Sequence, residues 1–166
     1  SYLCNGMNIK DIIQLKNKDI DGDKFSFQRA KTARTSKQQT SITVFLMDYS
    51  LSVIERYGNT NKSPEAYIFP ILEQNTTPAD QYKRKKNFTK TINQHFAKYA
   101  KSVGITEKIT TYWARHSFST ISINKGARME QIGEALGHTD IKTTMAYFAG
   151  FDNEAKRDIS KKLLDF

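Results

Sequence analysis

Glycine-terminated stretches of helical periodicity fill the second half of the chain, and they limit the fold more than any other feature. Apolar residues recur every three or four positions over residues 88–103, and Gly104 follows them. Three shorter patterns run into Gly126, Gly137 and Gly150 in the same way. Glycine is common just past the end of a helix, because it adopts the left-handed conformation there without strain. The second half is therefore predicted to be a succession of helices.

The first half predicts one small antiparallel sheet. Residues 24–28 and 40–46 have the alternating or β-branched character of strands, and a polar stretch separates them. Together they predict a β-hairpin with a long basic loop. Helices are expected at residues 1–20 (broken near Asn5-Gly6, with Asn8 capping the second piece), 49–57, 88–103, 114–125, 129–136, 141–147 and 153–164, and a loop at 74–80. The fold class is mainly α with a small antiparallel β-sheet (α+β), in one domain over residues 1–166.

Basic residues are concentrated in two segments. Lys and Arg total 26 against 17 Asp and Glu, which gives a formal net charge of +9. Residues 24–47 contain five basic residues and no acid, and residues 83–106 contain seven and no acid. Basic stripes interrupted by aromatic residues are typical of surfaces that bind a nucleic-acid backbone. The predicted DNA contacts are Arg29, Arg34, Lys37, Arg84, Lys85 and Lys86.

The chain carries no sign of a membrane or of an oxidising compartment. No apolar run approaches the roughly 18 residues that a membrane helix needs, so no membrane partner is expected. The single cysteine, Cys4, has no partner for an internal disulfide, which favours a reducing compartment such as the cytoplasm.

Four side chains suit phosphodiester cleavage without a metal. The sequence contains no HExxH, no CxxC pair, no carboxylates at metal spacing and no Gly-rich phosphate loop, so no metal and no cofactor are predicted. A metal-free route needs a covalent nucleophile, fixed positive charge and an acid for the leaving oxygen. The candidates are Tyr147 as nucleophile, Arg115 for the phosphate oxygens, His138 for a hydrogen bond and Lys31 as the acid.

Each candidate also has an ordinary structural interpretation. A Tyr at a helix end usually packs against its neighbours, and a His after Leu-Gly is usually a cap or a surface residue. Arg115 suits an ion pair equally well, and Lys31 in a basic loop suits a solvated charge. Only the order and spacing of the four residues distinguish the catalytic interpretation.

In that order and spacing the chain resembles the tyrosine recombinase (phage integrase) family. The resemblance rests on three motifs, which are Arg115-His116-Ser117-Phe118-Ser119-Thr120, Leu136-Gly137-His138 and, nine residues after the histidine, Tyr147. Weaker similarity at residues 5–12 and at Arg29-Ala30-Lys31-Thr32 extends it over nearly the whole chain. The first box, Gly6-Met7-Asn8, is similar to that of mobile-element integrases from Bacteroides-type bacteria.

The resemblance implies the catalytic-domain fold of that family and the activity of a site-specific recombinase. DNA is cleaved through a 3′-phosphotyrosine and rejoined by a free 5′-hydroxyl, without metal or ATP, for integration or excision of a mobile element. Arg115 matches the second family arginine, and His116 is expected to support the site. His138 matches the histidine of the third box, Lys31 the hairpin lysine and Tyr147 the nucleophile.

The resemblance also implies partners and a setting. The partners are double-stranded DNA and further protomers of the same recombinase in a synaptic complex, on the nucleoid in a bacterial cytoplasm. An upstream core-binding or arm-binding domain is expected outside this fragment. The helix at residues 153–164 is expected to dock on a neighbouring protomer, and packing on its own domain is the alternative.

Two positions depart from the family pattern. The first family arginine falls at Asn8, and the His or Lys three residues before the second arginine falls at Tyr112. Losing one such donor typically costs about a hundredfold or more in rate. Either another basic residue supplies the missing charge, with Arg29, Arg34 and Arg84 as candidates, or the fragment is a catalytically impaired DNA-binding module of the same fold. A helical RNA-binding protein is a third interpretation, which explains the charge but not the order of the motifs.

Overall fold

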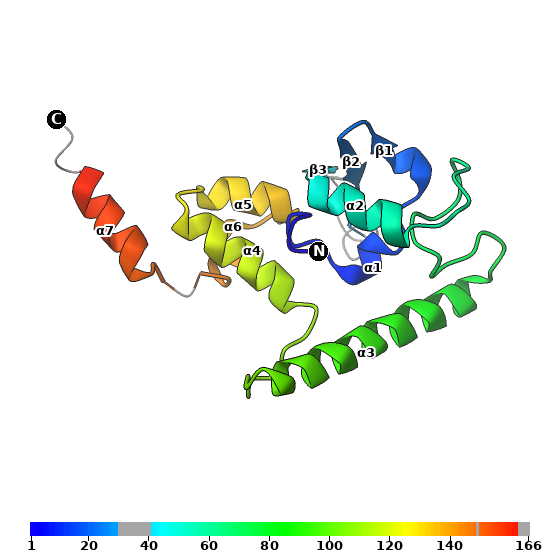
Figure 1. The fold of residues 1–166 in the computed structure, drawn as a ribbon. Helices are drawn as coiled ribbons and strands as arrows, with labels where there is room; N and C mark the ends of the chain where they lie inside the picture. The colour runs from blue at the N-terminus through cyan, green and yellow to red at the C-terminus, as the bar shows by residue number, and fades with distance from the viewer. Residues whose placement is uncertain (30–40, 149, 163–166) are drawn as a thin grey trace.

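The computed structural model describes residues 1–29, 41–148 and 150–162. Its elements are α1 (Ile9–Ile12), the 3-10 helix η1 (Asn17–Asp19), β1 (Ile20–Asp21), β2 (Lys24–Phe27), β3 (Ile42–Phe45), α2 (Asp48–Tyr57), α3 (Pro78–Ser102), α4 (Trp113–Asn124), α5 (Met129–Leu136), α6 (Ile141–Met145) and α7 (Asn153–Lys162). The predicted class, mainly α with a small antiparallel sheet, is confirmed (Figure 1).

The sheet has three antiparallel strands in the order β1-β2-β3. The predicted hairpin is confirmed as the β2–β3 pair, in which Phe25 lies opposite Val44. The short strand β1 was not predicted, and the turn at Asp21-Gly22-Asp23 joins it to β2. Residues 30–40, which include most of the predicted basic loop, lie outside the described residues.

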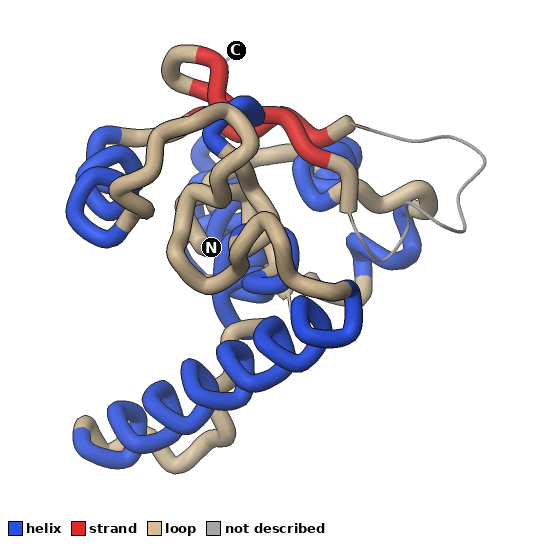
Figure 2. Tube along the Cα trace, turned by 90° about the vertical axis from the view of Figure 1, so that its right-hand side faces the viewer, coloured by secondary structure: helices blue, strands red, loops and turns tan. Residues whose placement is uncertain are grey.

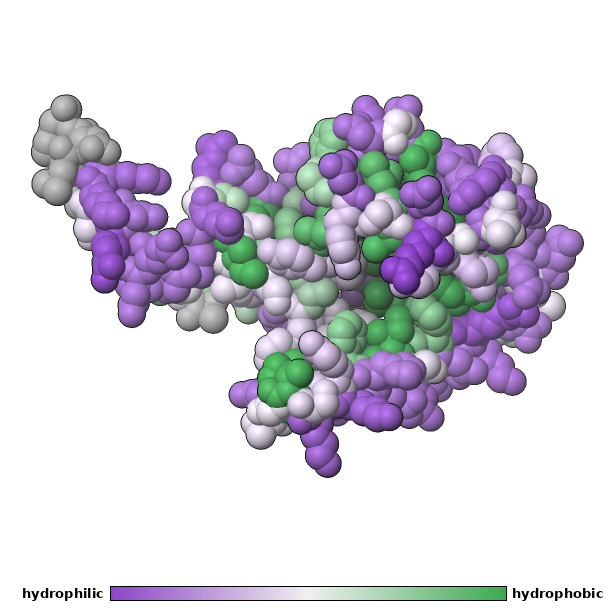
Figure 3. Space-filling model, viewed as in Figure 1, coloured by the Kyte–Doolittle hydropathy of each residue, from purple (hydrophilic) through white to green (hydrophobic). Residues whose placement is uncertain are grey.

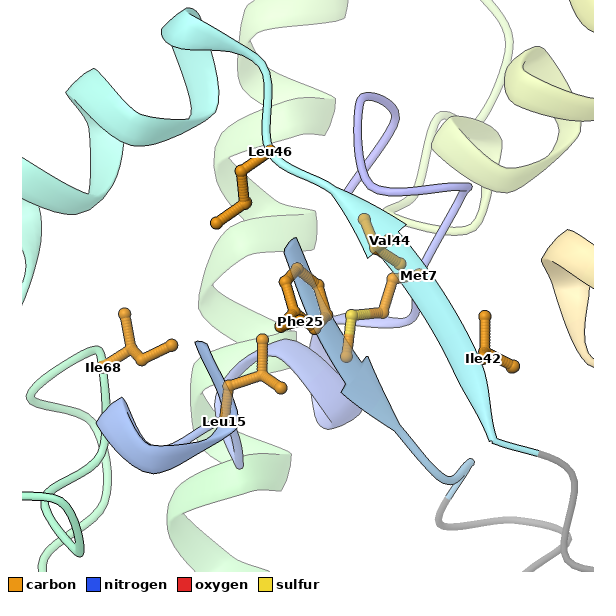
Figure 4. Packing of buried hydrophobic residues seen from close by; sticks show 7 residues of the cluster. All are labelled: Met7, Leu15, Phe25, Ile42, Val44, Leu46 and Ile68. Atoms are coloured by element: carbon orange, nitrogen blue, oxygen red, sulfur yellow. The ribbon is translucent and has the colours of Figure 1, made fainter. Parts of the chain in front are cut away.

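One face of the sheet carries the larger apolar core. Alternate residues of β2 and β3 point to the same side, because side chains along a strand alternate between its two faces. The buried residues of this cluster are Met7, Leu15, Phe25, Ile42, Val44, Leu46 and Ile68 (Figure 4). The N-terminal segment that supplies Met7 is thereby fixed against β3, where the Asn5 side chain also donates to the Thr43 carbonyl at 3.3 Å.

The N-terminal helix expected over residues 1–20 is wrong in extent. Residues 2–6 form turns instead, and within residues 1–20 only α1 and η1 are helical. The break predicted near Asn5-Gly6 is present, because these residues have φ values of 51° and 61°, in the left-handed region, which a helix does not contain. Asn8 does precede the helix as its N-cap residue, but its side chain makes no capping hydrogen bond.

Helix α3 is longer than predicted and begins at Pro78 rather than near Phe88. Pro78 occupies the first turn, where its missing N–H costs nothing, and the Thr77 side chain accepts a hydrogen bond from the Asp80 backbone. In Figures 1 and 2 the helix lies as a rod on the opposite side of the domain from the sheet. Phe88 packs on the core near Ile13, whereas the C-terminal part of the same apolar stripe is exposed.

The helices α4, α5, α6 and α7 match the predicted ones closely, although α7 ends the described part of the chain at Lys162. Helix α5 packs against both α4 and β3, which joins the helical half to the sheet. Helix α7 projects from the rest of the domain in Figure 1, and its visible surface in Figure 3 is mostly hydrophilic. Among the described residues, no helix combines the length and apolar character needed to cross a membrane.

Candidate active site

Arg115 lies at the centre of the candidate site and is only 3% exposed. Helix α4 carries it into the interior, where Nη1 donates to the Gly6 carbonyl at 3.2 Å and Nη2 donates to the Leu136 carbonyl at 2.6 Å. No carboxylate among the described residues forms an ion pair with it. Its pKa is lowered by burial and then by the charge of Arg29. A buried cation with no carboxylate partner attracts an anion strongly.

His138 is held by contacts at both ring nitrogens. Its Nε2 lies 3.0 Å from Nη2 of Arg115, and its Nδ1 lies 3.0 Å from the Thr144 hydroxyl. The guanidinium can only donate, so Nε2 accepts and the proton of the neutral ring sits on Nδ1. Burial, followed by the charges of Arg115 and Arg29, lowers the pKa of His138 to about 4. His138 is therefore neutral at physiological pH and fixes the orientation of the guanidinium.

Tyr147 follows helix α6 and faces the same centre. It is 8% exposed, and its ring centroid lies 6.0 Å from the guanidinium carbon of Arg115 and 5.6 Å from the ring of His138. Its hydroxyl is hydrogen-bonded to the hydroxyl of Tyr112, at the start of α4. The His116 ring lies 4.7 Å from the ring of Tyr147.

Arg29 joins this cluster from the end of β2. Its Nη1 donates at 3.3 Å to the carbonyl of Leu136, the same oxygen that accepts from Arg115. The two guanidinium nitrogens therefore lie within about 6 Å of each other. Gly137 leaves the space for this approach, since a Cβ there would meet Arg29 Cδ at 3.1 Å and would also contact Ile42.

The other predicted residues fall into three groups. Lys31, Arg34 and Lys37 lie outside the described residues. Arg84 is paired with Glu73 at 2.7 Å, on the exposed surface of α3. Asn8, Lys85 and Lys86 line a groove between α1 and α3, where Lys85 also donates to Gln14 at 2.9 Å.

Two parts of the site were not predicted from the sequence. The carbonyls of Gly6 and Leu136 fix Arg115, and the hydroxyl of Thr144 fixes His138. Backbone carbonyls leave no residue-type signal, so the first could not have been found. The threonine had a signal, because it lies six residues after the histidine, at the end of the next helix.

The sequence and the fold are both matched by a known family. Residues 2–154 match the model described as "Phage integrase family", so the chain belongs to that family. It is 29% identical over 142 residues to the tyrosine recombinase XerA of Pyrococcus horikoshii, covering 86% of this chain and 45% of that protein. It is 28% identical over 165 residues to a tyrosine recombinase of Pseudothermotoga lettingae, covering 98% and 51%. The chain thus spans about half the length of the curated relatives it matches.

Solved structures agree on the fold. The structure of the Tn1549 transposon integrase in complex with transposon right end DNA aligns with a TM-score of 0.63 and 18% identity, covering 98% of this chain and 56% of that one. The crystal structure of XerA recombinase aligns with a TM-score of 0.60 and 18% identity, covering 97% and 54%. The predicted tyrosine recombinase catalytic-domain fold is confirmed.

Proposed function

We propose that this chain is the catalytic domain of a site-specific DNA recombinase that cleaves and rejoins DNA through a 3′-phosphotyrosine. One observation carries the proposal. Arg115, His138 and Tyr147 converge from α4, the α5–α6 turn and the end of α6, and Arg29 adds a second cation to them. A nucleophile beside two fixed guanidinium groups is suited to attack on a phosphodiester.

In the proposed reaction Tyr147 loses its proton to water, and its oxygen forms a bond to phosphorus. The bond from phosphorus to the 5′ oxygen breaks, and the family's hairpin lysine, Lys31 in this chain, gives that oxygen a proton. Arg115 neutralises the charge that develops on the non-bridging oxygens. Rejoining is the reverse, with the 5′-hydroxyl as nucleophile and Tyr147 as leaving group. The phosphotyrosine keeps the energy of the broken bond, so no external energy is needed.

We further propose that Arg29 supplies the charge that Asn8 lacks. Arg29 shares a hydrogen-bond acceptor with Arg115, whereas Arg84, another of the three candidates, is engaged by Glu73. The competing reading, a catalytically impaired DNA-binding module, requires that no cation replace the first family arginine. The position of Arg29 favours an active enzyme.

The proposed substrate is double-stranded DNA, in a complex of several protomers. The groove between α1 and α3 exposes Lys86 beside Asn8, and a DNA backbone that enters this groove would reach the cluster around Arg115. A structural relative is an integrase that was solved with transposon DNA. We propose that α7 contacts a neighbouring protomer, that a further DNA-binding domain acts with this one, and that the protein works on the nucleoid in a bacterial cytoplasm.

The test is covalent capture on a library of nicked duplexes with randomised sequence, because the DNA target is unknown. In a nicked substrate the released strand diffuses away, so an active enzyme stays trapped on the DNA. We expect Tyr147→Phe to abolish the covalent adduct and to leave DNA affinity nearly unchanged. The matched control is Tyr57→Phe, which removes an exposed hydroxyl from α2.

Three results would contradict the proposal in whole or in part. If the unmodified chain forms no adduct with any duplex but still binds DNA, the impaired-module reading holds instead. If RNA competes better than duplex DNA for binding, the chain is an RNA-binding protein. An adduct that survives in Tyr147→Phe would assign the nucleophile to another residue.

A further inference from the structure

The hydroxyls of Tyr112 and Tyr147 are hydrogen-bonded to each other. Tyr112 occupies the N-cap position of α4 and is 45% exposed, so it lies at the rim of the site between the buried nucleophile and solvent. Its ring also meets the ring of His116 edge to face, with centroids 4.9 Å apart. The His116 ring in turn contacts Tyr147, and this three-ring cluster fixes where the two hydroxyls meet.

We propose that Tyr112 is a positioning residue that donates a hydrogen bond to the phenolate of Tyr147 as the nucleophile forms. The inference rests on the proposed function, since it concerns the same nucleophile. A phenolate oxygen can only accept hydrogen bonds, so once Tyr147 has lost its proton the shared hydrogen must come from Tyr112. Tyr112 can supply it because it stays protonated. Burial, and then its hydrogen bond to Tyr147, raise the pKa of Tyr112 above the ordinary value.

The same hydrogen bond acts in both directions of the reaction. In cleavage it stabilises the charge on Tyr147 before the bond to phosphorus forms. In rejoining Tyr147 is the leaving group, and the hydrogen bond stabilises the charge that returns to its oxygen. Removing the donor should therefore slow cleavage and rejoining by similar factors, without a large change in the equilibrium between them.

Replacing Tyr112 is expected to change the pH dependence of cleavage, and the other groups that face Tyr147 do not explain such a change. Arg115 and Arg29 are unchanged in every variant compared, so their charges contribute equally to each of them. His138 has its pKa lowered to about 4 and is neutral in that range. His116 contacts both rings but makes no hydrogen bond to either hydroxyl that the structure records, and it is the same in every variant compared.

The first test needs no DNA. With tyrosines labelled at the ring carbon that bears the hydroxyl, Tyr112→Phe should move the NMR resonance of Tyr147, and Tyr147→Phe should move that of Tyr112. The control variant Tyr57→Phe should move neither. Unmoved resonances in both directions would overturn the hydrogen-bonded pair, whatever the enzyme does to DNA.

The second test measures single-turnover cleavage of a captured duplex between pH 6 and pH 10. The leaving 5′ oxygen is replaced by sulfur, because a thiolate leaves without help from an acid. The proposed acid, Lys31, then no longer contributes to the pH dependence of the cleavage rate. We expect Tyr112→Phe to lower the rate about 10- to 100-fold at neutral pH, which is the effect of losing one hydrogen bond to a charged group. The rising alkaline limb should move up by about one to two pH units.

Three outcomes separate this inference from its competitors. If Tyr112→Phe lowers the cleavage rate by the same factor at every pH, Tyr112 only supports the fold. If the cleavage rate of this variant stays within about twofold of the parent chain, Tyr112 has no role in the reaction. A faster variant would mean that Tyr112 holds the nucleophile back. Tyr112→His, which installs the donor the family carries at this position, should recover part of the loss. If the parent chain never forms an adduct, the proposed function fails, while the NMR test still decides the pair.

Discussion

Replacing Arg29 by alanine tests whether this arginine has taken over the charge that is absent at position 8. The nitrogens of Arg29 and Arg115 lie within about 6 Å of each other around one carbonyl oxygen. A phosphoryl oxygen bound between them would lie about 4 Å from each charge, and a full unit of new negative charge there gains about 4 kcal/mol at an effective dielectric constant near 20. Only part of that charge develops in the transition state.

We therefore expect Arg29→Ala to raise the cleavage barrier by about 2–4 kcal/mol, which slows cleavage roughly 30- to 1,000-fold. Arg29→Lys should keep part of the activity, since it keeps the charge but not the planar fork. Both are measured as single-turnover formation of the covalent adduct, together with DNA affinity. Thermal unfolding is the control for the fold. Because the two cations repel each other, we expect the melting temperature of Arg29→Ala to equal or exceed that of the parent chain.

The sharper experiment is rescue. Asn8 lies two residues after Gly6, whose carbonyl binds Arg115, and it lines the groove that reaches Thr111. Asn8→Arg restores the arginine of the family pattern. We expect it to raise the cleavage rate of the Arg29→Ala variant at least tenfold. The role of Arg29 is refuted if the Arg29→Ala variant cleaves DNA at a rate within twofold of the parent chain. It is also refuted if Asn8→Arg changes the cleavage rate by the same factor in the parent chain and in the Arg29→Ala variant.

Three further predictions follow from the structure. The lowered pKa of His138, about 4 when folded against 6.5 unfolded, means that its contribution to stability is present above pH 6.5 and is lost as pH falls toward 4. His138→Gln should flatten the decline in melting temperature over that window, and an equally steep decline would contradict the assignment. Gly6→Ala forces a φ of 61° on alanine, which costs roughly 1–2 kcal/mol, and brings its Cβ to 2.8 Å from Arg115 Cα. It should lower the melting temperature and slow cleavage more than it weakens DNA binding, and a stable, fully active variant would refute the tight contact. Arg84→Ala should lower affinity and reduce the slope of log affinity against log salt by at most about 0.9; because Arg84 already pairs with Glu73, an unchanged slope would show that it makes no phosphate contact.

The helical half was predictable from the sequence because its signals are local. Apolar periodicity and glycine stops gave α4, α5 and α6 to within about two residues, and Gly137 has the left-handed conformation that such a stop uses. The start of α3 was missed because Pro78 was taken as a loop residue. The signal was present, since Thr77 before a proline and Asp80 is a typical N-terminus.

The N-terminal segment could not be predicted in the same way. The apolar residues around Ile9 and Ile12 favour a helix, but Asn5 and Gly6 turn the chain so that Met7 enters the core and the Gly6 carbonyl faces Arg115. That conformation is stabilised by contacts with residues more than a hundred positions away. Arg29 is a similar case, because its hydrogen bond to Leu136 spans 107 positions, and the sequence could only name it as one of three candidates.

We propose that the two departures from the family pattern are physically linked through the position of Arg29. Its charge acts on Arg115, His138 and Tyr112 together. A lysine at position 112 would have to carry its charge beside two guanidinium groups, and their repulsion would lower its pKa. A tyrosine donates a hydrogen bond without carrying a charge, so it functions where a third cation is disfavoured. The proposed transfer of the first positive charge from position 8 to Arg29 would therefore account for a neutral donor at position 112, and the two replacements are expected to be energetically coupled.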